Sequence, residues 1–266
     1  MTLYYAVGGG LGHRNRARRV LTALDIDIRD ADILVTSDLP AELEGNPEAH
    51  RRFLADRFKG RRVIVDVFPA GIQGELSGIE GVRFDHVARL IQWPAYRAAV
   101  PHDPPRFETT YVVEPLTPEH ETFAREASER VASLALADAP SPPAVSLPTE
   151  PFSLIVHSGP ADEVEELMAY ARELHPGCFL VATCCQMEMP AGFERLETNR
   201  ASDYFAAARH IVSAAGFNTM LETEPWREKH HVVPFPRRFD DQFLRAARRR
   251  ERCSLASGRA DPWILA

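Results

Sequence analysis

The sequence predicts an α/β protein built from two parallel-sheet domains. Short apolar runs rich in β-branched residues alternate with longer stretches of helical periodicity, and residues 62–68 (Arg-Val-Ile-Val-Asp-Val-Phe) are typical of a buried strand. This alternation favours parallel strands joined by helices. Residues 138–151 interrupt it with five prolines, which are poorly tolerated in helix and sheet interiors. We therefore expect a first domain at residues 1–137, a proline-rich linker at 138–151 and a second domain at 152–266.

Composition narrows the class of protein. The 266 residues are 45% hydrophobic, which is enough for two domain cores, and the net charge of −7 argues against binding to duplex nucleic acid. No apolar run reaches the roughly 20 residues of a membrane span, and the N-terminus carries no signal-peptide pattern. The four cysteines form no metal-binding or disulfide pattern. These features predict a cytoplasmic protein with reduced thiols and no metal site built from cysteines.

Strands and helices of the first half follow from local patterns. The helix expected at residues 117–136 begins with Thr-Pro-Glu, which supplies a cap, a proline at the first helical position and an early acid. We expect strands at residues 3–7, 32–36, 62–68, 86–93 and 109–113, and helices at residues 13–24 and 117–136.

The second half repeats the alternation. We expect strands at residues 152–157, 178–183, 193–197, 210–213 and 231–234, and helices at residues 161–174, 202–208, 217–224 and 240–250. Ligands of parallel-sheet domains bind beyond the carboxyl ends of the strands. The motifs described next all follow predicted strands, so we expect them at that edge.

The most informative motif spans residues 213–222 (Ser-Ala-Ala-Gly-Phe-Asn-Thr-Met-Leu-Glu). It predicts a strand end, a glycine turn and a helix start. Backbone N–H groups at a helix N-terminus attract anions. Glu222 comes one helical turn after Asn218, where a carboxylate can accept hydrogen bonds from two ribose hydroxyls. The motif therefore predicts a site for a nucleoside diphosphate.

A second glycine loop, Gly8-Gly-Gly-Leu-Gly-His13, follows the first predicted strand. Its spacing does not match the G-x-G-x-x-G fingerprint of dinucleotide-binding proteins. Because the ordinary pKa of histidine lies near neutrality, His13 is a candidate general base. Glu75 is an alternative base from another loop after a strand, and Asp103 is a candidate to orient His13.

These two motifs, together with Asp241-Gln242 and the following Arg245-Ala246, resemble the two-domain nucleotide-sugar glycosyltransferases of the GT-B fold. The sequence is similar to the N-acetylglucosaminyltransferase that makes lipid II and to related bacterial glycosyltransferases. The resemblance implies two Rossmann-like domains facing a cleft, in a shortened form. It also implies an inverting transfer of a hexosyl group to an acceptor hydroxyl or amine without a metal or other cofactor.

The resemblance also implies roles for single residues. Donor-side residues would bind the diphosphate, ribose and sugar: Ser158, Gly159, Gly216, Phe217, Asn218, Thr219, Glu222, Asp241 and Gln242. Acceptor-side residues would be Gly10, Gly12, Arg14 and the base, His13 or Glu75. The expected partners are a nucleotide sugar, with a UDP-sugar as first choice, and a small or lipid-linked acceptor. Peripheral membrane contact stays open, because a lipid acceptor would require it.

Two other functions fit the same motifs. A hydrolysing nucleotide-sugar epimerase has the same fold and a similar donor half, although it needs further acids near the sugar. A non-catalytic nucleotide-sugar-binding or protein-binding module is the other alternative, and the short chain favours it. The chain also departs from the family between residues 224 and 231, where it lacks the usual Gly-x-Pro turn.

Overall fold

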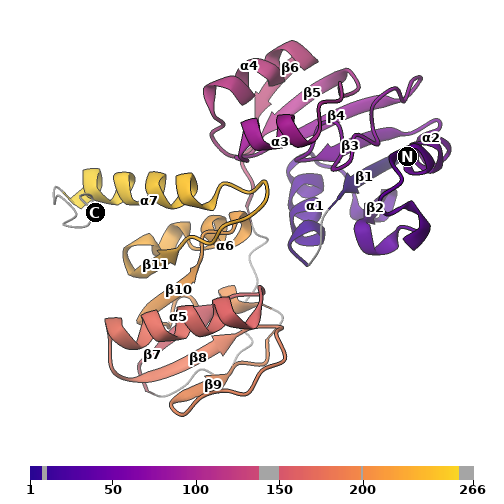
Figure 1. Cartoon of the computed structure of the whole chain (residues 1–266). Coiled ribbons are helices and arrows are strands. Elements are labelled where there is room, and N and C mark those ends of the chain that lie inside the picture. Colours follow the sequence, from indigo (N-terminus) through magenta and orange to yellow (C-terminus); the bar gives the residue numbers. More distant parts are fainter. Residues whose placement is uncertain (8–10, 138–149, 199, 258–266) are drawn as a thin grey trace. The chain divides into compact units, whose positions relative to one another are not determined.

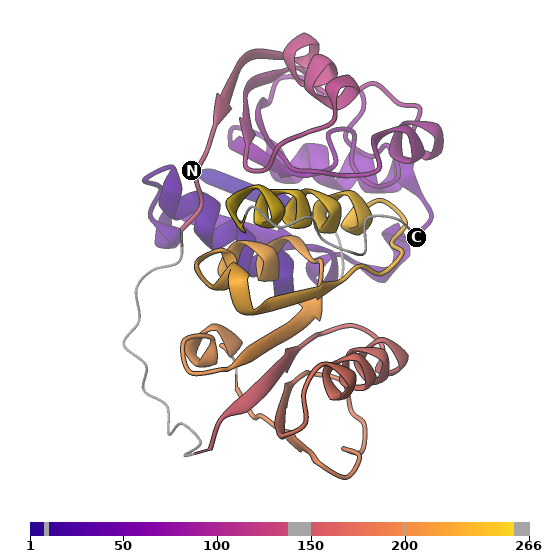
Figure 2. The same cartoon turned by 90° about the vertical axis from the view of Figure 1, so that its left-hand side faces the viewer.

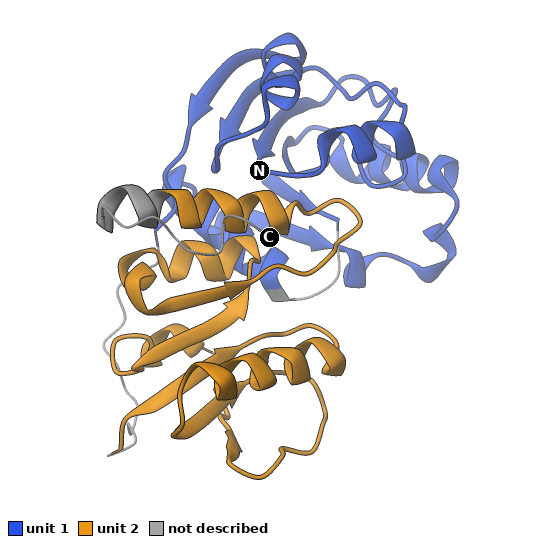
Figure 3. Ribbon diagram, turned by 60° about the vertical axis from the view of Figure 1, so that its left-hand side comes forward, with its two compact units in different colours: residues 1–139 blue, residues 140–266 orange. Residues whose placement is uncertain are grey.

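The computed structural model describes residues 1–7, 11–137, 150–198 and 200–257 of the 266-residue chain. The chain divides into two compact units, residues 1–139 (unit 1) and 140–266 (unit 2), coloured separately in Figure 3. Each unit contains one parallel β-sheet and its own hydrophobic core. The predicted fold class of two Rossmann-like parallel-sheet domains is therefore confirmed. Most of the predicted linker, residues 138–149, lies outside the described residues.

Unit 1 contains a six-stranded sheet in the order β2-β1-β3-β4-β5-β6, with all neighbours parallel (Figure 1). Central strand β3 is buried along nearly its whole length, as its β-branched composition predicts. The strands span Thr2–Ala6 (β1), Ala31–Val35 (β2), Arg62–Asp66 (β3), Arg83–Ala88 (β4), Phe107–Val112 (β5) and Ser128–Ser133 (β6).

Four α-helices connect these strands: Leu11–Ala23 (α1), Pro47–Phe58 (α2), Trp93–Ala99 (α3) and Pro118–Ala127 (α4). Helix α2 was not predicted, yet its start carries a clear signal. The Asn46 side chain accepts a hydrogen bond from the Ala49 N–H at 3.0 Å, and Pro47 occupies the first helical position.

The prediction of one long helix at residues 117–136 is wrong in its second half. Helix α4 ends at Ala127, and the chain continues as edge strand β6, parallel to β5. The Thr110 and Ser128 hydroxyls lie 2.6 Å apart between these two strands. Pairing with β5 thus overrides the helical propensity of the segment. The strand predicted at residues 86–93 likewise ends at Ala88, before α3 begins.

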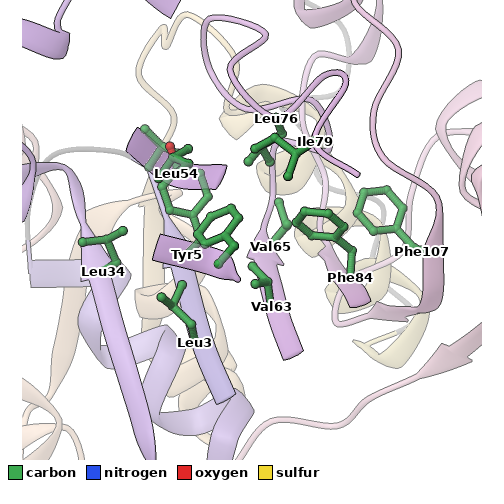
Figure 4. Packing of buried hydrophobic residues seen from close by; sticks show 12 residues of the cluster. Leu3, Tyr5, Leu34, Leu54, Val63, Val65, Leu76, Ile79, Phe84 and Phe107 are labelled. Carbon is green, nitrogen blue, oxygen red and sulfur yellow. The ribbon is translucent and has the colours of Figure 1, made fainter. Parts of the chain in front are cut away.

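The core of unit 1 lies between its strands and helix α2. Side chains from β1, β3 and β4 converge there with Leu54 of α2, as Figure 4 shows. Tyr5 packs edge-on against Phe58, and Phe58 against Phe84, with ring centroids 5.7 and 5.9 Å apart. The core therefore fixes α2 and these three strands relative to one another.

Unit 2 contains a five-stranded parallel sheet in the order β11-β10-β7-β8-β9. Helix α5 lies alongside the sheet (Figures 1 and 2). It buries residues at positions i, i+3, i+4 and i+7, and this stripe packs against side chains of the strands. The elements span Phe152–Val156 (β7), Ala161–Leu174 (α5), Cys178–Ala182 (β8), Phe193–Arg195 (β9), His210–Ala214 (β10), Phe217–Glu222 (α6), His230–Val233 (β11) and Gln242–Ser257 (α7).

Most predicted elements of unit 2 are confirmed, but the helix expected at residues 202–208 is only a short 3₁₀ turn, Ala201–Tyr204. Tyr204 and Phe205 are buried against the sheet, so packing of two adjacent aromatic rings replaces helical periodicity there. Among the helices of the described residues, none has both the length and the apolar character needed to cross a membrane.

Strand order defines a topological switch point in each sheet. In unit 2, β7 lies between β8 and β10, so the chain leaves β7 toward one side and later returns to the other. In unit 1, β1 lies in the same way between β2 and β3. Loops that follow the two central strands diverge at such a point and leave a crevice at the carboxyl edge, where ligands of these folds bind.

Candidate functional site

The switch point of unit 2 brings together two of the predicted donor-side segments. Strands β10 and β7 are paired in parallel, with Ser213 opposite Val156. The turn at Gly216, after β10, and the Ser158-Gly159 loop, after β7, therefore leave the sheet at the same edge. These segments are 57 positions apart in sequence (Gly216 against Gly159), and the fold makes them neighbours.

Gly216 is the N-cap of helix α6, and its carbonyl accepts a hydrogen bond from the Met220 N–H at 3.0 Å. A Cβ atom added at Gly216 would meet no other group within 4 Å, so the space directly beside this turn is unfilled. The first N–H groups of a helix have no acceptor within the helix. Helix α6 consists of only six residues, so its dipole adds little beyond those groups.

The remaining predicted donor-side residues of α6 differ in burial. Phe217 is buried, whereas Asn218, Thr219 and Glu222 are half-buried. Glu222 follows Asn218 by four positions, so both lie on one face of the helix. That face therefore presents an amide and a carboxylate together.

The Ser158-Gly159 loop is closely packed on one side. Ser158 is exposed, whereas a Cβ atom added at Gly159 would lie 2.2 Å from Nε2 of His157 and 2.8 Å from a carboxylate oxygen of Glu163. Any larger residue at position 159 would therefore have to displace one or both of these side chains.

Asp241 and Gln242 have structural contacts. The carboxylate of Asp241 accepts the Leu244 N–H at 3.0 Å and caps helix α7. The buried side chain of Gln242 accepts the Phe235 N–H at 3.0 Å. This second bond closes the loop between β11 and α7 at its base, so the pair fixes the path of that loop.

Three residues that the motifs did not single out form a network at this edge. Nε2 of His157 lies 2.6 Å from Oε2 of Glu163, and the Arg237 guanidinium binds both oxygens of Glu163. Arg237 belongs to the loop closed by Gln242, and Glu163 belongs to the first turn of α5. The network therefore ties that loop to α5. In the sequence, the only indication of this network was the histidine directly before Ser158-Gly159.

Two arginines of α7 support α6 from inside the unit. Arg245 donates to the carbonyl of Ala215, next to the Gly216 turn, and to Asp240, at 2.8 and 2.9 Å. Arg249 donates to the hydroxyl of Thr223 at 3.0 Å and forms an ion pair with Glu224. Helices α6 and α7 therefore lie side by side, as all three ribbon views show.

The switch point of unit 1 holds the predicted base His13. Its Nδ1 lies 3.3 Å from the carboxylate of Asp66, the last residue of β3, and 2.9 Å from the Arg16 guanidinium. Asp66 is buried and also accepts hydrogen bonds from Tyr4 and Arg16, at 2.8 and 2.9 Å. Burial alone would raise the pKa of Asp66, but Arg16 and His13 hold it well below its ordinary value.

Asp66 is therefore a carboxylate, and it orients His13. The prediction that Asp103 has this role is wrong, because Asp103 is exposed and Asp66 makes the contact. Both contacts of the His13 ring, to Asp66 and to Arg16, are made through Nδ1, and among the described residues Nε2 has no partner. The His13 side chain is 15% exposed, in contrast to the fully buried Asp66.

The backbone directly after Asp66 is strained. Val67 has a φ of 69°, a region that β-branched residues rarely occupy. The Phe68 N–H donates to the Asp66 carbonyl at 2.8 Å and closes a three-residue γ-turn, while the Val67 carbonyl lies 3.1 Å from Nε2 of His86. Strain of this kind gathers at functional sites, where surrounding contacts maintain it.

Glu75, the alternative base, lies inside unit 1. It is fully buried, and its oxygens accept hydrogen bonds from the Tyr5 hydroxyl and from the N–H groups of Ile72 and Gln73, at 2.9, 3.1 and 2.8 Å. These three donors make Glu75 the centre of its own loop. A general base must be reached by substrate, so the structure argues against that role.

The other acceptor-side residues are placed only in part. Arg14 donates to Asp38 at 2.6 Å on the surface of unit 1. Gly12 lies in the first turn of α1, and Gly10 lies outside the described residues. Within the described parts of the chain, no group of three acidic, histidine or cysteine side chains is arranged to hold a metal ion.

Comparisons with known proteins identify the fold. No model of a known protein family matches the chain, and no curated protein matches it. Solved structures do match, and several of them are glycosyltransferases. The glycotransferase of kitacinnamycin is 14% identical over 99% of this chain and 91% of its own, with a TM-score of 0.59. The glycosyltransferase SnogD from Streptomyces nogalater is 14% identical over 88% of this chain and 81% of its own, with a TM-score of 0.51.

A third matching structure is the glycosyltransferase SsfS6 from Streptomyces sp. SF2575, complexed with thymidine diphosphate. It is 14% identical over 96% of this chain and 86% of its own, with a TM-score of 0.53. At this identity the likeness shows the fold alone, and the chain has the fold of solved GT-B glycosyltransferases. None of these three is the lipid II-forming enzyme, so that finer similarity stays a prediction.

Proposed function

We propose that this protein is a glycosyltransferase that moves a sugar from a nucleoside diphosphate sugar to an acceptor hydroxyl or amine, with inversion and without a metal ion. One observation carries the proposal: the Gly216 turn and the Ser158-Gly159 loop leave neighbouring strands at the switch point of unit 2. The shared fold, in which SsfS6 is found with thymidine diphosphate, supports the same assignment.

On the donor side, the diphosphate would lie against the start of α6. The N–H groups after Gly216, with the side chains of Asn218 and Thr219, would bind its oxygens. Glu222, on the same helix face as Asn218, would accept hydrogen bonds from the ribose hydroxyls. The loop between β11 and α7 would contribute Asp241 to the recognition of the sugar. The bond from the Phe235 N–H to Gln242 would hold that loop in place.

On the acceptor side, His13 would be the general base. Nε2 of His13 would take the proton from the acceptor hydroxyl as its oxygen attacks the anomeric carbon. The bond from that carbon to the diphosphate oxygen then breaks, and the nucleoside diphosphate leaves with the electron pair. Asp66 stabilises the resulting imidazolium. Preorganised donors at the α6 start would stabilise the leaving diphosphate, and removing one typically costs about 10²-fold in rate.

The test is incubation of the protein with UDP-, TDP- and GDP-sugars, with and without a panel of acceptors, in buffer containing EDTA. A glycosylated acceptor and a released nucleoside diphosphate, found by mass spectrometry, support the proposal. Release of a free epimer without acceptor identifies an epimerase instead. Calorimetric binding of nucleotide sugars without turnover under any condition identifies a binding module, and absence of both binding and turnover removes the assignment.

A further inference from the structure

His157 lies at the switch point of unit 2, directly after β7, and its ring is held on several sides. The side chain is only 8% exposed, and the ring stacks on Phe235 with centroids 5.5 Å apart and planes 27° apart. Nε2 lies 2.6 Å from Oε2 of Glu163. Both oxygens of Glu163 also bind Arg237. The orientation of the ring is therefore fixed before any ligand arrives.

The protons of this network can be assigned. Burial raises the pKa of Glu163, but hydrogen bonds from Arg237 and His157 outweigh that effect and lower it. Glu163 is thus a carboxylate near neutral pH, so the proton of a neutral His157 ring lies on Nε2 and points at Glu163. Nδ1 then carries a lone pair, and no hydrogen-bond partner for it exists among the described residues.

We propose that binding of a nucleoside diphosphate at this edge adds a proton to Nδ1 of His157, which then donates a hydrogen bond to a diphosphate oxygen. This inference rests on the proposed function of unit 2. It assigns His157 as a further phosphate-binding residue, with Glu163 as the residue that positions its ring.

The charges around His157 explain why a proton is needed. Its ring faces Glu163 of α5 and Arg237 of the β11–α7 loop, while Asp162 and Asp240 act on Arg237 from α5 and from the loop. Arg237 is already paired with Glu163. An incoming diphosphate therefore meets two further acids beside an arginine that is already paired, and a protonated His157 adds positive charge there.

The sign of the pH dependence follows from linkage. Burial lowers the pKa of His157 in the ligand-free protein, against the opposing effect of Glu163. A bound diphosphate favours the charged ring and raises that pKa. The contribution of His157 to binding is therefore complete below the pKa of the free ring. It is lost as the pH rises through the pKa of the complex.

The experiment is calorimetric titration of UDP and TDP at pH 7 in buffers that differ in enthalpy of ionisation. The slope of the observed binding enthalpy against that ionisation enthalpy gives the number of protons taken up. The expected result is a larger proton uptake for the wild type than for His157→Gln, whose slope reports the nucleotide alone. At pH 6, His157→Gln should bind about tenfold more weakly than the wild type, and at pH 8.5 nearly equally. The control His102→Gln removes an exposed imidazole from unit 1 and should match the wild type.

Equal proton uptake by the wild type and His157→Gln, with UDP bound by both, overturns the inference and leaves the proposed function intact. Failure of the wild type to bind any nucleoside diphosphate removes both. A second measurement needs no variant: ¹⁵N NMR of the wild-type imidazoles must show one buried ring gaining a proton on its δ nitrogen when UDP is added. An unchanged δ nitrogen in the saturated complex also overturns the inference.

Discussion

At the scale of single residues, the chemistry that we propose for unit 1 depends on the pairing of His13 with Asp66. A buried carboxylate with a lowered pKa, already bound by Arg16 and Tyr4, is a fixed anion. It holds Nδ1 of the His13 ring, and Nε2 has no partner among the described residues. The γ-turn at Val67 directly follows this carboxylate at the strand end, and the arrangement supports the proposal that His13 is the general base.

Replacing His13 with glutamine should lower kcat about 10²-fold or more, because loss of a general base typically costs 10²–10⁴-fold. The affinity for nucleoside diphosphates should stay unchanged, since that site is assigned to unit 2. Steady-state kinetics with the best donor and acceptor, together with calorimetry, check both parts. Asp103→Asn, an exposed substitution in the same unit, is the control. A His13→Gln enzyme with full kcat would contradict the assignment.

Replacing Glu222 with alanine should raise the dissociation constant for UDP about tenfold to a hundredfold, because it removes charged hydrogen bonds to the ribose. Titration with 2′-deoxy-UDP sharpens the measurement. The wild type should prefer UDP over its deoxy analogue, and Glu222→Ala should bind the two alike. Glu165→Ala, on the exposed side of α5, should keep the wild-type preference. If Glu222→Ala still discriminates, the carboxylate does not bind the ribose.

At the scale of elements, helix α7 fixes the turn that precedes α6. Buried Arg245 joins the Ala215 carbonyl to Asp240 through two nitrogens of one guanidinium. Lysine cannot span both acceptors in the same geometry. Arg245→Lys should therefore weaken binding of UDP about tenfold, the equivalent of one charged hydrogen bond. Calorimetry measures this effect, with the exposed Arg250→Lys as control. Wild-type affinity in Arg245→Lys would show that the turn needs no such support.

Helix α4 carries a buried histidine that makes no hydrogen bond through its ring. Both ring nitrogens of His120 lack a partner within the described structure, and the ring stacks on Trp93 with centroids 4.2 Å apart. Burial lowers the pKa of His120 to about 3, with a smaller effect from His86. Because the unfolded chain protonates near pH 6.5 and the folded one does not, this residue destabilises unit 1 as the pH falls below 6.5.

His120→Phe keeps the stacked ring and removes the unsatisfied nitrogens. We expect it to stabilise the protein by about 1–3 kcal/mol at pH 7.5. The gain should be larger by roughly 2 kcal/mol at pH 5, because pH 5 lies 1.5 units below the pKa of about 6.5 at which His120 is protonated in the unfolded wild type. Urea unfolding at both pH values measures the two differences. A gain that does not grow toward acid pH would mean that His120 is protonated in the folded protein.

At the scale of the whole molecule, sequence patterns predict what depends on neighbours in the chain. The buried strands and α5 follow from β-branched runs and from a helical stripe, and the Gly216 turn follows from one local motif. Strand β6 was missed because its pairing with β5 is a tertiary contact. The partners of His13 and Glu163 lie 53 and 74 positions away, so no spacing could indicate them. Only the order of the strands brings these side chains together.

Two units with separate sheets and cores imply a separable function. If the donor site lies entirely within unit 2, residues 140–266 expressed alone should fold and bind UDP within about threefold of the affinity of the whole chain, a difference below 1 kcal/mol. The same fragment should transfer no sugar, because the proposed base lies in unit 1. Circular dichroism establishes folding, calorimetry measures binding, and mass spectrometry detects transfer. A folded fragment that fails to bind UDP would mean that unit 1 contributes to the donor site, and a fragment that transfers sugar would remove His13 from the mechanism.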